Sequence, residues 1–114
     1  MILDETYMSQ TFGSNKALLT KTMGLFVNTA PGIFEKITSA VETGNSADLT
    51  RNAHSLKGSV GYFTKEGIYQ TSFELEQLGK AGISAENEVR VRELYEKLST
   101  ELEETVTALN DYIQ

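Results

Sequence analysis

The chain has 114 residues, no cysteine, and 16 acidic against 10 basic residues, which gives a formal charge of −6. This length suits one domain over residues 1–114, and the absence of cysteine excludes disulfide frameworks, thiolate catalysis and cysteine-based metal sites. The negative charge repels nucleic acids, and no apolar run approaches the roughly 20 residues of a membrane span, so we expect a cytoplasmic protein or the cytoplasmic part of a membrane-anchored kinase.

Apolar residues recur at three- and four-residue spacing over most of the chain, which contains a single proline. This period predicts helices rather than strands, so the expected fold class is all-α. Breaks rich in glycine, asparagine and threonine divide the chain into about six helices. In chain order, these helices should cover approximately residues 4–12, 16–28, 31–43, 46–63, 68–78 and 85–112.

Local signals support these bounds. The third helix should begin at Pro31, because the first helical position does not need a backbone N–H. Asn45 or Ser46 can cap the next helix. Four of the helices are long and are joined by short loops, which predicts an antiparallel four-helix bundle with one or two additional short N-terminal helices. The last helix should bury a stripe made of Val89, Leu94, Leu98, Leu102, Val106 and Leu109.

The helix that contains the only histidine has two distinct faces. Its core face follows 4-3-4-3 spacing and consists of Leu49, Ala53, Leu56, Val60 and Phe63. His54 points away from this stripe and is expected to face solvent. Lys57, Gly58 and Gly61 stand three, four and seven residues further on, so they should lie on the same side of the helix as His54.

Two glycines beside the histidine need an explanation. Glycine inside a helix costs about 1 kcal/mol relative to alanine. Close helix packing is one reason for Gly58 and Gly61. The other is that the surface is kept flat, so that a macromolecule can bring a reactive group to the imidazole. We favour the second reason, because both glycines fall on the side expected to be exposed.

An exposed imidazole beside a lysine suits some chemistries better than others. No serine or cysteine stands in a nucleophile elbow, and one histidine with scattered acids does not make a metal site. Phosphoryl transfer fits better, because a neutral imidazole is a nucleophile and the Lys57 ammonium can offset phosphoryl charge. The chain has no Gly-rich ATP-binding loop, so the phosphoryl donor should be another protein.

The segment DLTRNAHSLKGS, residues 48–59, resembles the signature of histidine-containing phosphotransfer (HPt) domains of bacterial phosphorelays, in which A-H-x-L-K-G precedes small residues. Ile68 and the pair Leu75-Glu76 fall where that family has leucine and Leu-Glu. The likeness covers nearly the whole chain and is to HPt domains at the C-termini of hybrid sensor kinases. Thr64 stands where the family usually has glycine, and Gly67 can take over part of that turn.

The resemblance implies a phosphorelay intermediate without kinase activity of its own. His54 would accept a phosphoryl group from the aspartate of a receiver domain and pass it to another receiver. Lys57 would steady the phosphoryl charge, and Gly58 would admit the receiver. The partner surface would consist of His54, Lys57, Gly58 and Gly61. It would be flanked by Arg51, Ser55, Tyr62 and the first helix. The domain would be a monomer, either free or linked to a hybrid sensor kinase, and would bind no metal or cofactor, because the receiver brings the Mg²⁺.

Helix geometry suggests one more residue for the site. If the helices on either side of the Thr64–Gly67 turn are antiparallel, Glu76 lies about 18 Å and His54 about 15 Å from Thr64 along their helices. We therefore predict that Glu76, or alternatively Gln77, accepts a hydrogen bond from Nδ1–H of His54 and leaves Nε2 free to attack. An ordinary surface acid is the competing interpretation.

Three other functions remain open. A helical docking module would bind receiver domains without carrying phosphate. A dimerising histidine-kinase domain would also present a phosphohistidine on a helix, but its histidine is normally followed by an acid, whereas Ser55 follows here. A structural bundle with an incidental histidine is the third.

Overall fold

The computed structural model describes residues 3–114. This part of the chain contains five helices joined by short turns, and none of its residues is in a strand. Residues 1 and 2 of the predicted domain lie outside the described part. The helices are α1 (Glu5–Phe12), α2 (Lys16–Thr43), α3 (Ser46–Val60), α4 (Ile68–Ala81) and α5 (Glu88–Ile113). The all-α prediction is therefore confirmed, with one short N-terminal helix ahead of four long ones.

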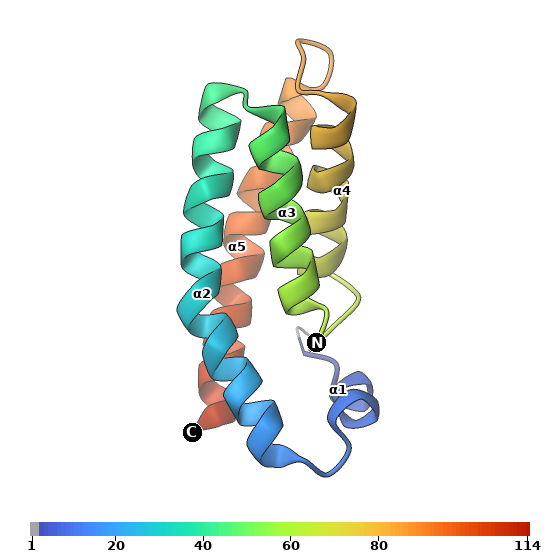
Figure 1. Ribbon diagram of the computed structural model, residues 1–114, viewed down its shortest axis with the longest axis vertical. Helices are drawn as coiled ribbons and strands as arrows, with labels where there is room; N and C mark the ends of the chain where they lie inside the picture. The colour runs from blue at the N-terminus through green and yellow to red at the C-terminus, as the bar shows by residue number, and fades with distance from the viewer. Residues whose placement is uncertain (1–2) are drawn as a thin grey trace.

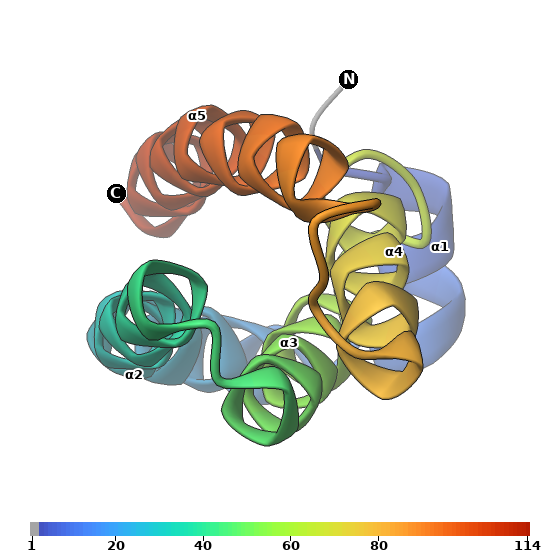
Figure 2. The ribbon, with the colours of Figure 1, turned by 90° about the horizontal axis from the view of Figure 1, so that it is seen from above.

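The four long helices form an elongated antiparallel bundle, and the molecule is 47 Å in its longest dimension. The short helix α1 lies to one side, below the lower ends of α3 and α4 (Figure 1). Seen from above, the helices follow one another around the core in the order α2, α3, α4, α5 (Figure 2). The neighbouring pairs pack directly, whereas α3 and α5 lie diagonally, with no Cα atoms within 8 Å of each other. The predicted four-helix bundle is thus confirmed, and α3 and α4 share one long interface.

The predicted break before Pro31 is wrong, because α2 continues through this residue to Thr43. Proline inside a helix removes one backbone hydrogen bond, and its ring clashes with the carbonyl four residues before it, so the helix kinks or breaks unless other interactions hold it. Here Pro31 is exposed, while Met23, Phe26, Ala30 and Ile37 bury one continuous stripe on both sides of it. Packing has overridden the local signal, and α2 only changes direction near its middle (Figure 1).

The core of the bundle consists of the apolar stripes of the four long helices. The stripe predicted for α3 is entirely buried, including Phe63 just beyond its end. For α5 two positions differ. Val89 lies in the first turn and is 66% exposed, and Val91 takes its place in the core, whereas Val106 is only half-buried and packs against the edge of the core. The remaining buried residues of this helix are Leu94, Leu98, Leu102, Thr105 and Leu109.

Candidate functional site

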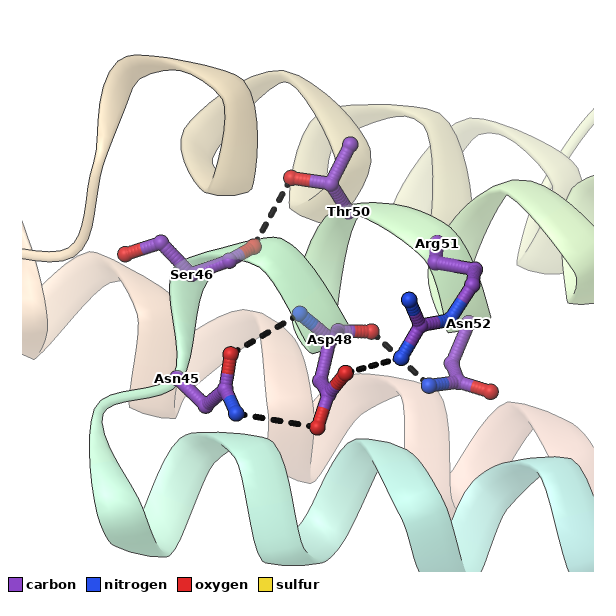
Figure 3. A network of polar contacts seen from close by, with 6 residues as sticks. All are labelled: Asn45, Ser46, Asp48, Thr50, Arg51 and Asn52. Atoms are coloured by element: carbon purple, nitrogen blue, oxygen red, sulfur yellow. Dashed lines mark hydrogen bonds and ion pairs between the residues drawn. The ribbon is translucent and has the colours of Figure 1, made fainter.

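The N-terminus of α3 is fixed by a network of side chains (Figure 3). The Asn45 side chain accepts a hydrogen bond from the backbone N–H of Asp48 and donates one to the Asp48 carboxylate, at 3.0 and 2.9 Å. Asn52 in turn donates to the Asp48 backbone carbonyl at 2.8 Å. This network confirms Asn45 as the cap and sets the start of the helix that carries His54.

Close packing against α4 occurs in the same region. Gly79 of α4 lies so near to α3 that a Cβ atom at this position would be 2.8 Å from the backbone nitrogen of Thr50. The Ser46 hydroxyl also accepts a hydrogen bond from the backbone N–H of Ile83, at 2.8 Å. These contacts bring the C-terminal half of α4 against the N-terminal half of α3.

The turn between α3 and α4 joins the other ends of the two helices. Gly67 caps α4 with a φ of +56°, a conformation that favours glycine. Thr64 has a negative φ, and its hydroxyl accepts a hydrogen bond from the Glu66 backbone N–H at 3.1 Å. The turn therefore does not need a glycine at position 64, because Gly67 supplies the left-handed residue.

His54 and Glu76 meet between these two fixed ends. The His54 Nδ1 and Glu76 Oε2 atoms lie 2.7 Å apart, so the contact predicted from helix geometry is present, and Glu76 rather than the exposed Gln77 makes it. The imidazole side chain is 66% exposed, whereas the carboxylate side chain is only 4% exposed. The site thus combines an accessible ring with a buried acceptor.

Lys57 holds the second oxygen of the same carboxylate. Its Nζ atom donates to Glu76 Oε1 at 2.6 Å and lies 4.9 Å from the centre of the Phe73 ring. The Lys57 side chain is 17% exposed. The expected lysine beside His54 is therefore present, but its ammonium is engaged by Glu76 and covered by an aromatic ring.

The ionisation of Glu76 determines where the imidazole proton lies. Burial raises the pKa of Glu76, but hydrogen bonds from Lys57 and His54 and the charge of Lys57 outweigh this effect, so the pKa lies below its ordinary value. An ionised carboxylate can only accept hydrogen bonds. The proton in the contact consequently belongs to Nδ1, and Nε2 is the unprotonated nitrogen of the neutral ring.

The other predicted site residues divide into open and covered positions. Arg51, Ser55, Gly58 and Tyr62 are all exposed. At Gly58, a Cβ atom would meet nothing within 4 Å. The Arg51 guanidinium is paired with the Asp48 carboxylate, as Figure 3 shows. Tyr62 lies beside Phe12 of α1, with ring centroids 6.3 Å apart.

The expectation that Gly61 continues the open surface is wrong. Gly61 is buried, and its carbonyl accepts a hydrogen bond from the Tyr7 hydroxyl at 2.6 Å. A Cβ atom here would lie 3.3 Å from Lys65 Nζ and from the edge of the Tyr69 ring. Close packing of α1 and the start of α4 over the end of α3 therefore explains this glycine, which was the competing interpretation.

Sequence reasoning missed two neighbours of the carboxylate. Phe73 covers Lys57, and the Lys80 Nζ atom lies 3.7 Å from Glu76 Oε2. Both residues stand on α4 at helical spacing from Glu76, three before it and four after it. Once Glu76 is placed in the site, this spacing alone identifies them.

Among residues 3–114 no group of three or more metal-ligating side chains converges, and none of the helices described there is long and apolar enough to cross a membrane. What the arrangement offers is a single accessible nitrogen nucleophile on a rigid helix, with a buried carboxylate behind it and two lysines around that carboxylate. Such a group can form a covalent bond to an electrophile that another molecule presents.

Comparison with known families identifies the class of protein. The model of the Hpt domain family matches residues 21–112, a range that includes His54, Lys57, Glu76 and Lys80. The chain therefore belongs to the Hpt domain family, as the A-H-x-L-K-G segment predicted. This membership supports a histidine phosphotransfer role in two-component signalling, and domains of the family are phosphocarriers rather than kinases.

A solved structure supports the fold independently. Histidine-containing phosphotransfer protein B (HptB) from Pseudomonas aeruginosa PAO1 matches with a TM-score of 0.86. The match covers 98% of this chain and 94% of that protein, at 20% sequence identity. At this identity the likeness concerns the fold, including the short helix before the bundle. No curated protein sequence matches significantly.

Proposed function

We propose that His54 is the phosphoacceptor of a phosphorelay, which receives a phosphoryl group from a receiver-domain aspartate and passes it to a second receiver. The observation that carries this proposal is the hydrogen bond between His54 Nδ1 and the buried carboxylate of Glu76. It fixes the ring as the Nδ1–H tautomer, so that Nε2 is the attacking atom. The mostly exposed ring leaves this atom open to a partner.

The transfer step balances with the groups of the two proteins. A bond forms between Nε2 of His54 and phosphorus, while the bond between phosphorus and the aspartate oxygen breaks and the aspartate leaves as a carboxylate. The Nδ1 proton stays on the ring, which becomes positively charged. The carboxylate of Glu76 lies 2.7 Å away and stabilises this charge as it develops.

Lys57 acts through Glu76 in this scheme. Its hydrogen bond and charge keep the carboxylate ionised in a buried position, where the acceptor would otherwise become protonated. The exposed surface at Gly58 admits the receiver, with Arg51, Ser55 and Tyr62 at its edges. The receiver supplies the Mg²⁺ for its own aspartyl phosphate, and this domain contributes no metal ligand.

The experiment that tests the proposal follows a radiolabelled phosphoryl group from a phosphorylated receiver domain to this protein, with a His54→Gln variant measured in parallel. We expect label on the wild-type chain only, and this label should be lost in acid and retained in base. Binding of a receiver without any transfer of label would contradict the proposal and favour a docking module that carries no phosphate. Elution as a dimer in size-exclusion chromatography would instead favour a dimerising kinase domain over the expected monomer.

A further inference from the structure

Lys80 is the more exposed of the two lysines beside the Glu76 carboxylate. Its side chain is 56% exposed, compared with 17% for Lys57. The Lys80 Nζ atom lies 3.7 Å from Glu76 Oε2, which is the same oxygen that accepts from His54. This distance is that of an ion pair without a hydrogen bond. The Lys80 ammonium is therefore a neighbour of the imidazole and is not held by a hydrogen bond.

In the unphosphorylated site, the positive charge of Lys57 is already paired with the Glu76 carboxylate. Its ammonium donates to Glu76 Oε1 at 2.6 Å and lies against the Phe73 ring, so moving it would leave this oxygen of a buried carboxylate without its hydrogen-bond donor. Lys80 has no such constraint, since it reaches the carboxylate from solvent at the i+4 position on the same helix. Of the two lysines, only Lys80 can move without breaking the arrangement that orients His54.

An arriving phosphoryl group changes the charge of the site strongly. It brings about two negative charges, in a protein whose formal charge is already −6. The ring becomes positive on phosphorylation, but Glu76 beside Nδ1 already balances that charge. A further cation next to the phosphoryl oxygens would therefore stabilise the phosphorylated form.

We propose that Lys80 supplies this cation, by moving from Glu76 to the phosphoryl group on Nε2 of His54, while Lys57 stays on Glu76. This role rests on the proposed function of His54. It makes Lys80 a residue that stabilises the phosphorylated form relative to the free form. The position of the transfer equilibrium between a receiver domain and this protein should therefore depend on it.

The test measures this equilibrium for four proteins with one phosphorylated receiver: wild type, Lys80→Gln, Lys80→Arg and Lys97→Gln. We expect Lys80→Gln to shift the equilibrium towards the phosphorylated receiver by roughly three- to fivefold, the size of a partly screened ion pair. Lys80→Arg should keep the wild-type equilibrium, because it keeps the positive charge. A higher salt concentration should reduce the difference between wild type and Lys80→Gln. Lys97→Gln is the matched control, because it removes the same charge from an exposed position on α5, the helix diagonally across the bundle from α3.

A second comparison separates action on the phosphoryl group from action through Glu76. In a Glu76→Gln background, the effect of Lys80→Gln should persist, because the phosphoryl group is still present when the carboxylate is not. Loss of the effect in this background, or an equal effect of Lys97→Gln, would overturn the role of Lys80.

The two proposals fail in different ways. Label that reaches equal equilibrium levels on wild type and Lys80→Gln would overturn only the role of Lys80. Absence of label at His54 in the wild-type protein would overturn the proposed function, and the role of Lys80 with it.

Discussion

The Nδ1 atom of His54 and the Oε2 atom of Glu76 lie 2.7 Å apart, although 22 residues separate them along the chain. The contact joins an exposed ring to a buried carboxylate across the interface of α3 and α4. A flexible surface pair would pay a side-chain entropy cost to stay in one geometry. Here the acceptor is fixed by its burial and by Lys57, so only the imidazole has to be ordered.

Replacement of Glu76 should remove the preference of the His54 imidazole for one tautomer. In Glu76→Ala, Nδ1 loses its acceptor, and we expect a mixture of the two neutral forms in place of the Nδ1–H form. Nitrogen-15 correlation spectra of the His54 ring distinguish these forms directly. Phosphoryl transfer should fall by roughly tenfold, by analogy with the lower end of the losses that follow removal of a group that orients a metal-binding histidine. An unchanged tautomer and rate in a folded variant would show that Glu76 does not orient the ring.

The stability of the protein should depend on pH through Glu76. Its pKa is lower in the folded than in the unfolded state, so its contribution is fully present above the unfolded pKa and is lost as pH falls through the folded pKa. Urea unfolding of wild type and Glu76→Gln over an acidic pH series measures this contribution as a difference. We expect the gap between the two free energies of unfolding to narrow as pH falls. A constant gap would contradict the lowered pKa.

Replacing Gly58 with alanine should stabilise the fold and slow phosphoryl transfer. A methyl group at this position meets open space, and alanine is the better helix former, so Gly58→Ala should raise the free energy of unfolding by about 0.5–1 kcal/mol. The same methyl group should slow phosphoryl transfer, because it stands on the surface that we propose for the receiver.

Gly32 provides the matched control for Gly58. It is also exposed and lies inside α2, and a methyl group added there would meet nothing within 4 Å. Gly32→Ala should therefore stabilise the protein by a similar amount and leave transfer unchanged. Equal transfer rates for the two alanine variants would exclude the role proposed for Gly58.

The sequence alone predicts the fold class, the four-helix bundle and the contact of His54 with Glu76, because these depend on helical periodicity and on the rise per residue. It fails at Pro31 and Gly61, where contacts from other helices decide the outcome. The stripe of α2 carries the helix through Pro31, and Tyr7 of α1 covers Gly61. The pairing of Lys57 with Glu76 also needs the side-chain geometry, since spacing alone places the lysine beside the histidine without showing which group it binds.

Gly79 should affect the geometry of the site through the packing of α4 against α3. A methyl group at this position would clash with the backbone of Thr50, which cannot move as a flexible side chain can. Gly79→Ala should thus destabilise the fold by about 1–3 kcal/mol, the cost of overpacking, and push α4 away from α3. Thermal unfolding checks the first effect, and the nitrogen-15 spectrum of His54 checks the second, since a displaced Glu76 releases Nδ1. Normal spectra together with normal stability would show that the two helices can adjust without cost.

The contacts that hold α3 against α4 at both ends determine when the pair of His54 and Glu76 forms. The Gly67 turn closes one end of the pair, and Gly79 with the bond from Ile83 to Ser46 closes the other. The imidazole and the carboxylate are thereby brought together when the chain folds, before any partner arrives. If His54 carries the proposed transfer, a site built in this way would require no helix movement in this protein. The rate would then depend on how often a receiver arrives in the right orientation and on the receiver's own chemistry.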